Sequence, residues 1–477
     1  MPPAPHPSFC LFSLSAGSGA VGQHSLIRKF EIIARRGFDA VELMNDDLVA
    51  FAESDEFGRI YRNADLPSPS LSPEDSPRSV GQPSAMLDTY NAMGPCSLNT
   101  LHREVAAAAF IGLLSKSLGI KVATLQPVRD VEGWADEEQR AEAFRRFTSR
   151  FEICHALGTN MLLICSNCQP SESLVSASDY AKRAGADLAE VAELAAQWTP
   201  MEATARWRKH GCSDPVELMR RAFRHYRPPT PLSPPESRSG SVADAHEAYL
   251  PGQQPALSHL SSLVSAAMRQ LPSLSPSSTP SSSTPSVPYT PIRIGYEALS
   301  WGTHVSLWRA AWDVVQAANH PNVGIVLDSF NTVAREWADP CSPSGISQPE
   351  HEADERLSQS IAMMGDVLIP EKIFFLQIAD AKRVPVPLAP SPSPTEPRPS
   401  RMIWSRSNRL FPLEKERGAF LPIVEFVQMV HSIGYRGPWS VEVFSDSIHE
   451  QDMSVPITHV DRGFRSLERL VEAVHGQ

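Results

Sequence analysis

The sequence contains no apolar run long enough to cross a membrane, since a transmembrane helix needs roughly 18 or more consecutive apolar residues. Its N-terminus, MPPAPHPSFCLFSLSAGSGA, lacks the basic leading segment of a secretory signal. Cysteine is scarce: the seven cysteines are odd in number and widely spread, which is typical of reduced thiols rather than of a disulfide framework. We therefore expect a soluble, cytoplasmic protein with no membrane partner.

Concentrated positive charge is also missing. The net charge is -11, and the 43 lysines and arginines are scattered along the chain. Because phosphate backbones are bound by a concentrated basic face, these features disfavour a nucleic-acid partner. Assembly into a homo-oligomer is left open by the sequence.

What the sequence does contain is a series of short apolar runs rich in β-branched and aromatic residues. Most are continuous rather than alternating, as expected for parallel strands that are buried on both faces. The eight runs are FCLFSLS (9–15), AVELM (40–44), VATLQPV (122–128), MLLIC (161–165), IRIGYEAL (292–299), NVGIVLD (322–328), IFFLQIA (373–379) and WSVEVF (439–444).

Helical segments lie between most of these runs. The segment 25–36 places Leu26, Phe30 and Ile33 on one face and is followed by Gly37, a typical helix stop. A second amphipathic segment, 419–433, ends at Gly434. Eight strands that alternate with helices, without a glycine-rich phosphate loop, favour a closed (β/α)₈ TIM barrel over an open doubly wound sheet. We predict a single barrel domain over residues 1–477.

Three segments rich in proline and serine interrupt the pattern, at 54–98, 198–290 and 384–400. Such composition buries too little apolar surface to offset the entropy of ordering. We interpret all three as insertions between barrel elements and expect the first two to be disordered. Helix-forming pieces occur inside the second, at 215–225 and 254–270.

Polar side chains occur near the carboxyl ends of the last four predicted strands, where the active sites of TIM barrels lie. They are Glu297, Asp328, Gln377 and Glu442. Three carboxylates that converge in a barrel are costly to bury unless a cation compensates them. An all-oxygen set favours a hard divalent cation, Mg²⁺ or Mn²⁺, over zinc. A cap or salt-bridge role is the alternative for each residue taken singly.

The runs GFDAVEL, RIGYEALSWGTHV, NVGIVLDSFN, LQIADAKR, WSRSNRLFP and GPWSVEVFSD resemble the xylose-isomerase-like barrel superfamily. Within it, the chain resembles the fungal 3-dehydroshikimate dehydratases of quinate catabolism. The resemblance extends from about residue 25 to 470 and skips the insertions. It implies that the four residues named above hold the metal. It also implies dehydration of 3-dehydroshikimate, an anionic cyclic ketone, to protocatechuate.

This reaction needs a Lewis acid, proton-transfer groups and a cation for the substrate carboxylate. Arg129 is the first candidate for that cation, because a guanidinium grips a carboxylate through two hydrogen bonds. Arg409 and Arg406 are the next candidates, and a surface role is the alternative for all three.

The proton-transfer group is left open. His304 follows the fifth strand and is a candidate, although it also suits a helix cap. Asn331 lies three residues after Asp328, where we expect a histidine in bacterial relatives, so base chemistry does not transfer to it directly. Glu42 and Asp46, at the end of the second strand, are further candidates.

Two other functions stay open. Sugar isomerases and epimerases share this scaffold, but they usually carry His-x-Lys-Asp where this chain has Gln377-Ile378-Ala379-Asp380. A catalytically degraded barrel that uses its insertions for protein interactions is the second. The C-x-x-C at Cys165 and Cys168 has no second pair and is interpreted as two reduced thiols.

Overall fold

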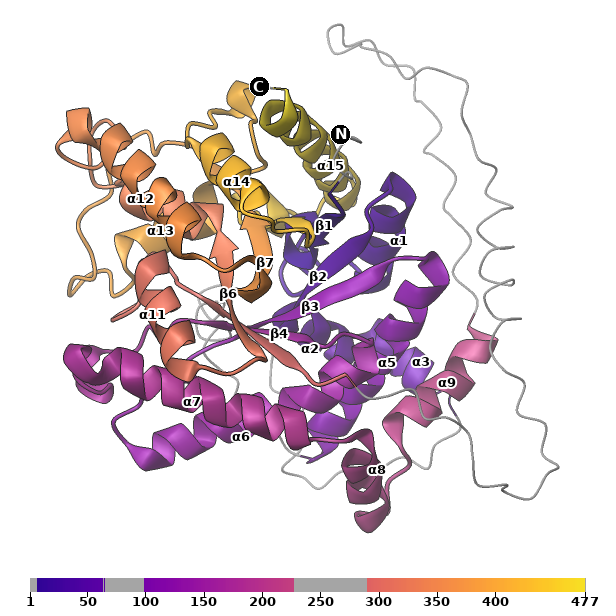
Figure 1. The fold of residues 1–477 in the computed structure, drawn as a ribbon. Coiled ribbons are helices and arrows are strands. Elements are labelled where there is room, and N and C mark those ends of the chain that lie inside the picture. The colour runs from indigo at the N-terminus through magenta and orange to yellow at the C-terminus, as the bar shows by residue number, and fades with distance from the viewer. Residues whose placement is uncertain (1–6, 63, 65–97, 227–289, 477) are drawn as a thin grey trace, which may run out of the picture.

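The computed structural model of the chain describes residues 7–62, 64, 98–226 and 290–476. Eight parallel strands form a closed barrel in the order β1-β10-β7-β6-β5-β4-β3-β2, surrounded by helices (Figure 1). This confirms the predicted fold class. The strands are β1 (Phe9–Phe12), β2 (Ala40–Met44), β3 (Lys121–Val128), β4 (Met161–Cys165), β5 (Arg293–Glu297), β6 (Val323–Asp328), β7 (Ile373–Ile378) and β10 (Trp439–Val441).

The α-helices cover the outside of the barrel and contribute to the loops at its ends. They are α1 (Leu26–Arg36), α2 (Asn45–Glu53), α3 (Asp55–Arg62), α5 (Leu98–Leu118), α6 (Glu137–Leu157), α7 (Ala177–Gln197), α8 (Pro200–Lys209), α9 (Pro215–His225), α11 (Trp308–Ala318), α12 (Ala353–Val367), α13 (Ser400–Asn408), α14 (Ile423–Ser432) and α15 (Val455–His475). A short antiparallel pair, β8 (Asp380–Ala381) and β9 (Arg409–Leu410), lies beside the barrel sheet.

The first helix shows how local sequence sets these boundaries. The Ser25 side chain accepts a hydrogen bond from the Arg28 backbone N–H at the start of α1. At the other end, Gly37 adopts a left-handed conformation with φ of 104°. Glycine does so at little cost because it has no Cβ. Both ends of this helix follow the sequence pattern.

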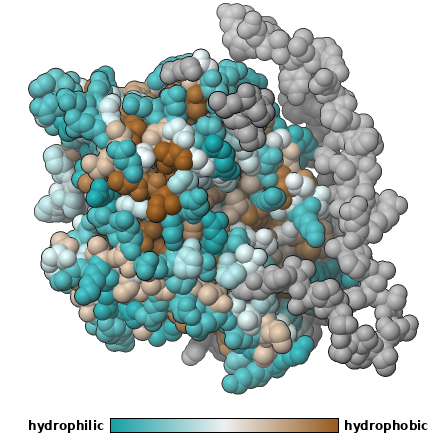
Figure 2. Space-filling view, viewed as in Figure 1, coloured by the Kyte–Doolittle hydropathy of each residue, from teal (hydrophilic) through white to brown (hydrophobic). Residues whose placement is uncertain are grey.

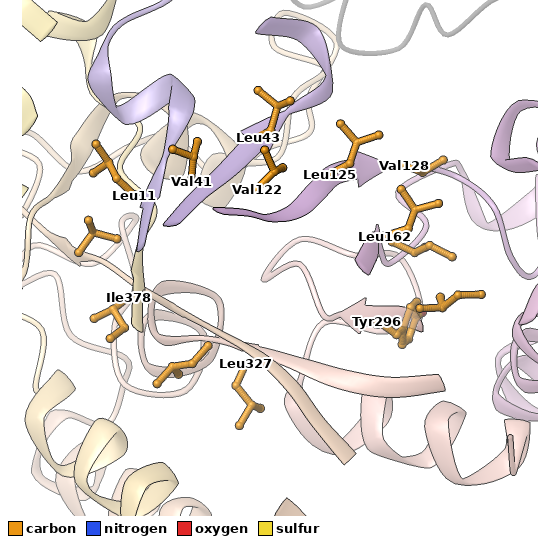
Figure 3. Packing of buried hydrophobic residues seen from close by; sticks show 14 of the residues in the cluster. Leu11, Val41, Leu43, Val122, Leu125, Val128, Leu162, Tyr296, Leu327 and Ile378 are labelled. Carbon is orange, nitrogen blue, oxygen red and sulfur yellow. The ribbon is translucent and has the colours of Figure 1, made fainter. Parts of the chain in front are cut away.

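Apolar side chains fill the space between the barrel and the helices. Figure 3 shows Leu11, Val41, Leu125, Leu327 and Ile378 within this layer, and all five are fully or almost fully buried. A separate, smaller cluster packs within the barrel, and it includes Cys10, Ala40, Met161, Leu163, Val326 and Phe375.

Several predicted boundaries were wrong, including that of the last strand, which was predicted over 439–444 but ends at Val441. The first strand ends at Phe12, and residues Ser13–Ala16 form a 3-10 turn instead. Helix α14 begins at Ile423 rather than at 419. The Asp380 carboxylate accepts hydrogen bonds from the N–H groups of Phe420 and Leu421, which holds these two residues outside the helix.

The segments 54–98 and 198–290, predicted to be disordered insertions, both include ordered helices. Helix α3 lies within the first, and α8 and α9 lie within the second. Aromatic packing explains the order of α9, because the Phe223 ring lies 5.4 Å from that of Phe110 on α5. The predicted disorder of 65–97 and 227–289, and the helix-forming piece 254–270, lie outside the described residues. Residues 384–400 form a mostly exposed loop, as predicted.

The molecular surface is mostly polar on the face shown in Figure 2. Hydrophobic residues gather there in one patch, over the region where β6 and β7 lie in Figure 1. Among the described helices, none combines the length and apolar character that a membrane span requires.

Candidate metal centre

Strand register brings the four predicted ligands to one face of the sheet. Asp328 on β6 pairs with Gln377 on β7, and Gln377 pairs with Ser440 on β10. Glu297 pairs with Val326, two residues before Asp328. Because successive side chains of a strand alternate between faces, residues two apart share a face. Glu297, Asp328, Gln377 and Glu442, two residues after Ser440, therefore all project to the same side.

Three of the four form a tight acidic cluster. One carboxylate oxygen from each of Glu297, Asp328 and Glu442 lies within 4.8 Å of the others, and all three side chains are buried. Burial raises the pKa of Asp328 to about 6, against the opposing effect of the Arg409 charge. The pKa of Glu297 is raised by burial and by the charges of Glu442 and Asp328. A divalent cation would relieve this repulsion.

Gln377 supplies an independent sign of a ligand. Its side chain is fully buried, and its Oε1 atom has no hydrogen-bond partner. A buried amide oxygen without a partner costs free energy unless something else occupies its lone pairs. An oxygen-binding cation is such a partner, so the four residues fit the hard divalent metal that the sequence predicted.

Asn331 and Arg409 both bind these carboxylates directly. The Asn331 Nδ2 group donates to Glu297 Oε1 and to Asp328 Oδ2, each at 2.7 Å. Its Oδ1 accepts from the Ser300 backbone N–H at 3.0 Å. Asn331 lies in a π-helical turn, Phe330–Ala334, directly after β6. Both ends of the Asn331 amide are thus engaged, and the side chain links Glu297 and Asp328 to the Ser300 backbone.

Arg409 was predicted to bind substrate, but the structure places it within the ligand cluster. Its Nη1 atom lies 2.9 Å from Asp328 Oδ2 and 2.7 Å from Glu442 Oε2, and the residue is 1% exposed. Arg409 therefore acts as a fixed internal counter-ion. With three ionised carboxylates and one guanidinium, one divalent cation balances the charge of the cluster.

Glu42 lies inside the barrel, where it accepts hydrogen bonds from three side chains. The Nε2 groups of Gln126 and Gln377 bind its Oε1 atom at 3.1 and 2.7 Å, and the Ser440 hydroxyl binds its Oε2 atom. Gln126 also donates to Glu442 Oε1 at 2.8 Å. The sequence analysis missed Gln126 and Ser440. Their signal was a polar residue within an apolar run, in VATLQPV and WSVEVF.

Arg129, which follows β3, and Arg406, which lies on α13, are near the same carboxyl group. Burial raises the pKa of the Asp46 carboxyl, and the charges of Arg129 and Arg406 oppose this rise. The Arg406 guanidinium lies 4.6 Å from the centre of the Phe444 ring. Two of the three predicted arginines, Arg129 and Arg406, thus lie close enough to Asp46 to favour its ionised form.

His304 lies against helix α7. Its ring centre is 4.8 Å from that of Tyr180, and its Nε2 atom is buried without a hydrogen-bond partner. Across the described residues, no hydrogen bond or ion pair links His304 with any of the four ligands. Cys165 is closer to them, because its thiol lies 3.4 Å from Glu297 Oε2. Cys165 and Cys168 of the C-x-x-C form no disulfide with each other.

Comparisons with known proteins agree with the barrel fold described above. Residues 288–469, which carry β5 to β10, match the family model described as xylose isomerase-like TIM barrel. A solved structure described as a xylose isomerase-like TIM barrel/4-hydroxyphenylpyruvate dioxygenase fusion protein superposes with a TM-score of 0.52 at 20% identity. It aligns with 98% of this chain and 43% of its own. The fold is a xylose isomerase-like TIM barrel.

The resemblance to dehydratases is also confirmed. The chain is 27% identical over 462 residues to the 3-dehydroshikimate dehydratase of Neurospora crassa, which covers 96% of this chain and 92% of that protein. It is 36% identical over 155 residues to the 3-dehydroshikimate dehydratase of Pseudomonas aeruginosa. That match covers 32% of this chain and only 18% of the bacterial protein.

Proposed function

We propose that this chain is a metal-dependent 3-dehydroshikimate dehydratase that eliminates water to give protocatechuate. The observation that carries the proposal is the buried cluster of Glu297, Asp328 and Glu442, with the unpartnered Gln377 oxygen beside it in the strand register. The similarity to the Neurospora crassa enzyme over nearly the whole chain supports the choice of substrate.

Glu297, Asp328, Gln377 and Glu442 would hold a Mg²⁺ or Mn²⁺ ion. When bound, such an ion supplies a Lewis acid for the negative charge that develops on a ketone oxygen. Arg409 and Asn331 keep the carboxylate ligands in place through charge-assisted hydrogen bonds.

The substrate is an anion, and Arg129, after β3, and Arg406, on α13, provide positive charge near Asp46. We propose that one or both bind the substrate carboxylate. Asp46, half-buried and near both arginines, is better placed than His304 to exchange a proton with a substrate held there. Loss of water from 3-dehydroshikimate is redox-neutral, so the reaction requires no electron carrier.

The test uses the full chain after dialysis against EDTA, mixed with 3-dehydroshikimate and either Mg²⁺ or Mn²⁺. We expect the ultraviolet absorbance of protocatechuate to rise only when metal is added. The Asp328→Asn variant, purified in parallel, serves as the control for spontaneous dehydration and contaminating enzyme. No rise at high enzyme concentration overturns the proposal. Turnover of ketoses without an aromatic product would indicate a sugar isomerase or epimerase instead.

A further inference from the structure

The Glu42 side chain contacts the side chain of Gln377 inside the barrel. It lies on β2, and Gln377 lies on β7, separated around the barrel by β1 and β10. The contact between the two side chains therefore crosses the barrel interior rather than following neighbouring strands. Both residues are completely buried.

The two ends of a carboxamide have almost the same size and shape, so packing does not determine which end faces a given neighbour. Hydrogen bonding determines it instead. The Gln377 Nε2 group donates to Glu42 Oε1 at 2.7 Å, while its Oε1 atom has no partner. An amide oxygen binds a hard cation, whereas an amide NH₂ group presents hydrogen atoms that repel it.

Glu42 is itself held as an acceptor. Three donors surround its carboxylate: the side-chain amides of Gln126 and Gln377, and the hydroxyl of Ser440. This arrangement leaves Gln377 only one favourable orientation, with NH₂ towards Glu42 and oxygen away from it.

We propose that Glu42 is a positioning residue of the metal centre, which holds the Gln377 amide with its oxygen towards the cation. The inference rests on the metal centre of the proposed function and adds a role that differs from proton transfer. Residues that orient metal ligands in this way commonly change metal affinity by a factor of about 10–100 when they are replaced.

The experiment measures Mn²⁺ binding by the full chain after EDTA dialysis, using calorimetry and the electron paramagnetic resonance signal of free Mn²⁺. Glu42→Met keeps the length of the side chain but removes the acceptor, and we expect affinity to fall by about 10–100-fold. Glu42→Gln keeps an oxygen for Gln126 and Gln377, and its new NH₂ group faces the Ser440 hydroxyl. We expect this variant to bind Mn²⁺ nearly as well as the wild type.

Exchanging the two residues gives a sharper test. Gln377→Glu alone places two carboxylates against each other, and we expect it to bind Mn²⁺ more weakly than the double variant. In Glu42→Gln/Gln377→Glu the hydrogen bond is reversed, and a carboxylate oxygen faces the cation. We expect the double variant to bind Mn²⁺ at least as tightly as the wild type.

Thr124→Val is the matched control. Thr124 pairs with Glu42 across β2 and β3, is fully buried, and donates to the backbone oxygen of Met161 at 3.2 Å. We expect it to lower stability without a change in Mn²⁺ affinity.

If Glu42→Met binds Mn²⁺ with wild-type affinity, the inference is overturned while the proposed function stands. The same holds if Gln377→Glu binds Mn²⁺ as tightly as the double variant. A Glu42→Gln variant that loses Mn²⁺ affinity as strongly as Glu42→Met also overturns the inference, because Glu42→Gln keeps the acceptor for Gln377. Conversely, if the chain shows the expected Mn²⁺ pattern without dehydrating 3-dehydroshikimate, the positioning role is supported and the proposed function fails.

Discussion

Glu132 connects the loop that follows β3 with the loop that follows β4, and its burial predicts a pH-dependent stability. Its Oε1 atom accepts hydrogen bonds from the Asn167 backbone N–H at 2.8 Å, the Tyr296 hydroxyl at 2.9 Å and the Tyr180 hydroxyl at 3.1 Å. The Oε2 atom is buried without a partner. Burial raises the pKa of Glu132 from its ordinary value of 4.5 to about 7.

Proton linkage gives the direction in which stability changes with pH. Because the folded state holds the Glu132 proton more tightly than the unfolded state, this contribution to stability is fully present below pH 4.5 and is lost as pH rises through about 7. Between pH 5 and pH 8 the shift corresponds to a loss of ~2.5 kcal/mol. With an unfolding entropy of ~2.1 cal/mol/K per residue over roughly 370 residues, this lowers Tm by ~3 °C.

The perturbation is Glu132→Gln, which keeps an oxygen for the three donors and removes the titrating group. We expect urea unfolding in EDTA to show that the wild type loses ~2.5 kcal/mol more than the variant between pH 5 and pH 8. Tyr180→Phe removes one hydrogen bond that lowers the pKa of Glu132, so it should move the pH-dependent loss to higher pH. Equal losses in the wild type and Glu132→Gln would refute the reasoning.

Three further predictions concern the candidate metal centre and the proposed substrate site. Arg409→Met should lower the free energy of unfolding by ~3–5 kcal/mol, because it leaves buried carboxylates unpaired. Arg150→Met is the control, because it breaks the buried ion pair with Glu104. It should lower the free energy of unfolding by a comparable amount without changing Mn²⁺ affinity, and a changed affinity would contradict the location of the candidate metal centre. Asn331→Leu should weaken Mn²⁺ binding by about 10–100-fold in calorimetry, and unchanged binding would argue against its positioning role. Arg129→Met should reduce kcat/KM by about 10–100-fold, with partial recovery in Arg129→Lys; wild-type kinetics would remove it from the substrate site.

Local patterns explain why the barrel and its ligands were predictable. A strand that is buried on both faces reads as a continuous apolar run, and all eight such runs form barrel strands. The carboxyl ends of parallel strands meet at one rim of a barrel, so a polar residue near the end of each run is expected to approach the others. Glu297, Asp328 and Glu442 were found in this way, and their carboxylates do converge.

The same reasoning misjudged segments whose structure depends on distant partners. Proline and serine density predicted disorder for most of 198–290; the helix-forming piece 215–225 is confirmed as α9, but the order of α8 was not predicted. In α8, Trp207 is 1% exposed and donates its indole N–H to Glu152 on α6. Such contacts join residues far apart in the chain, and composition does not encode them.

The sequence by itself determined the fold and the residues of the candidate metal centre, because both depend on residues at regular positions along each strand. Only the tertiary structure decided what the remaining polar residues do. Arg409 became a counter-ion for Asp328 and Glu442 rather than a substrate ligand. Glu42 became the partner of Gln377, a contact between residues 335 positions apart. Closure of the barrel places β2 opposite β7. The residue pattern within either strand does not predict this contact.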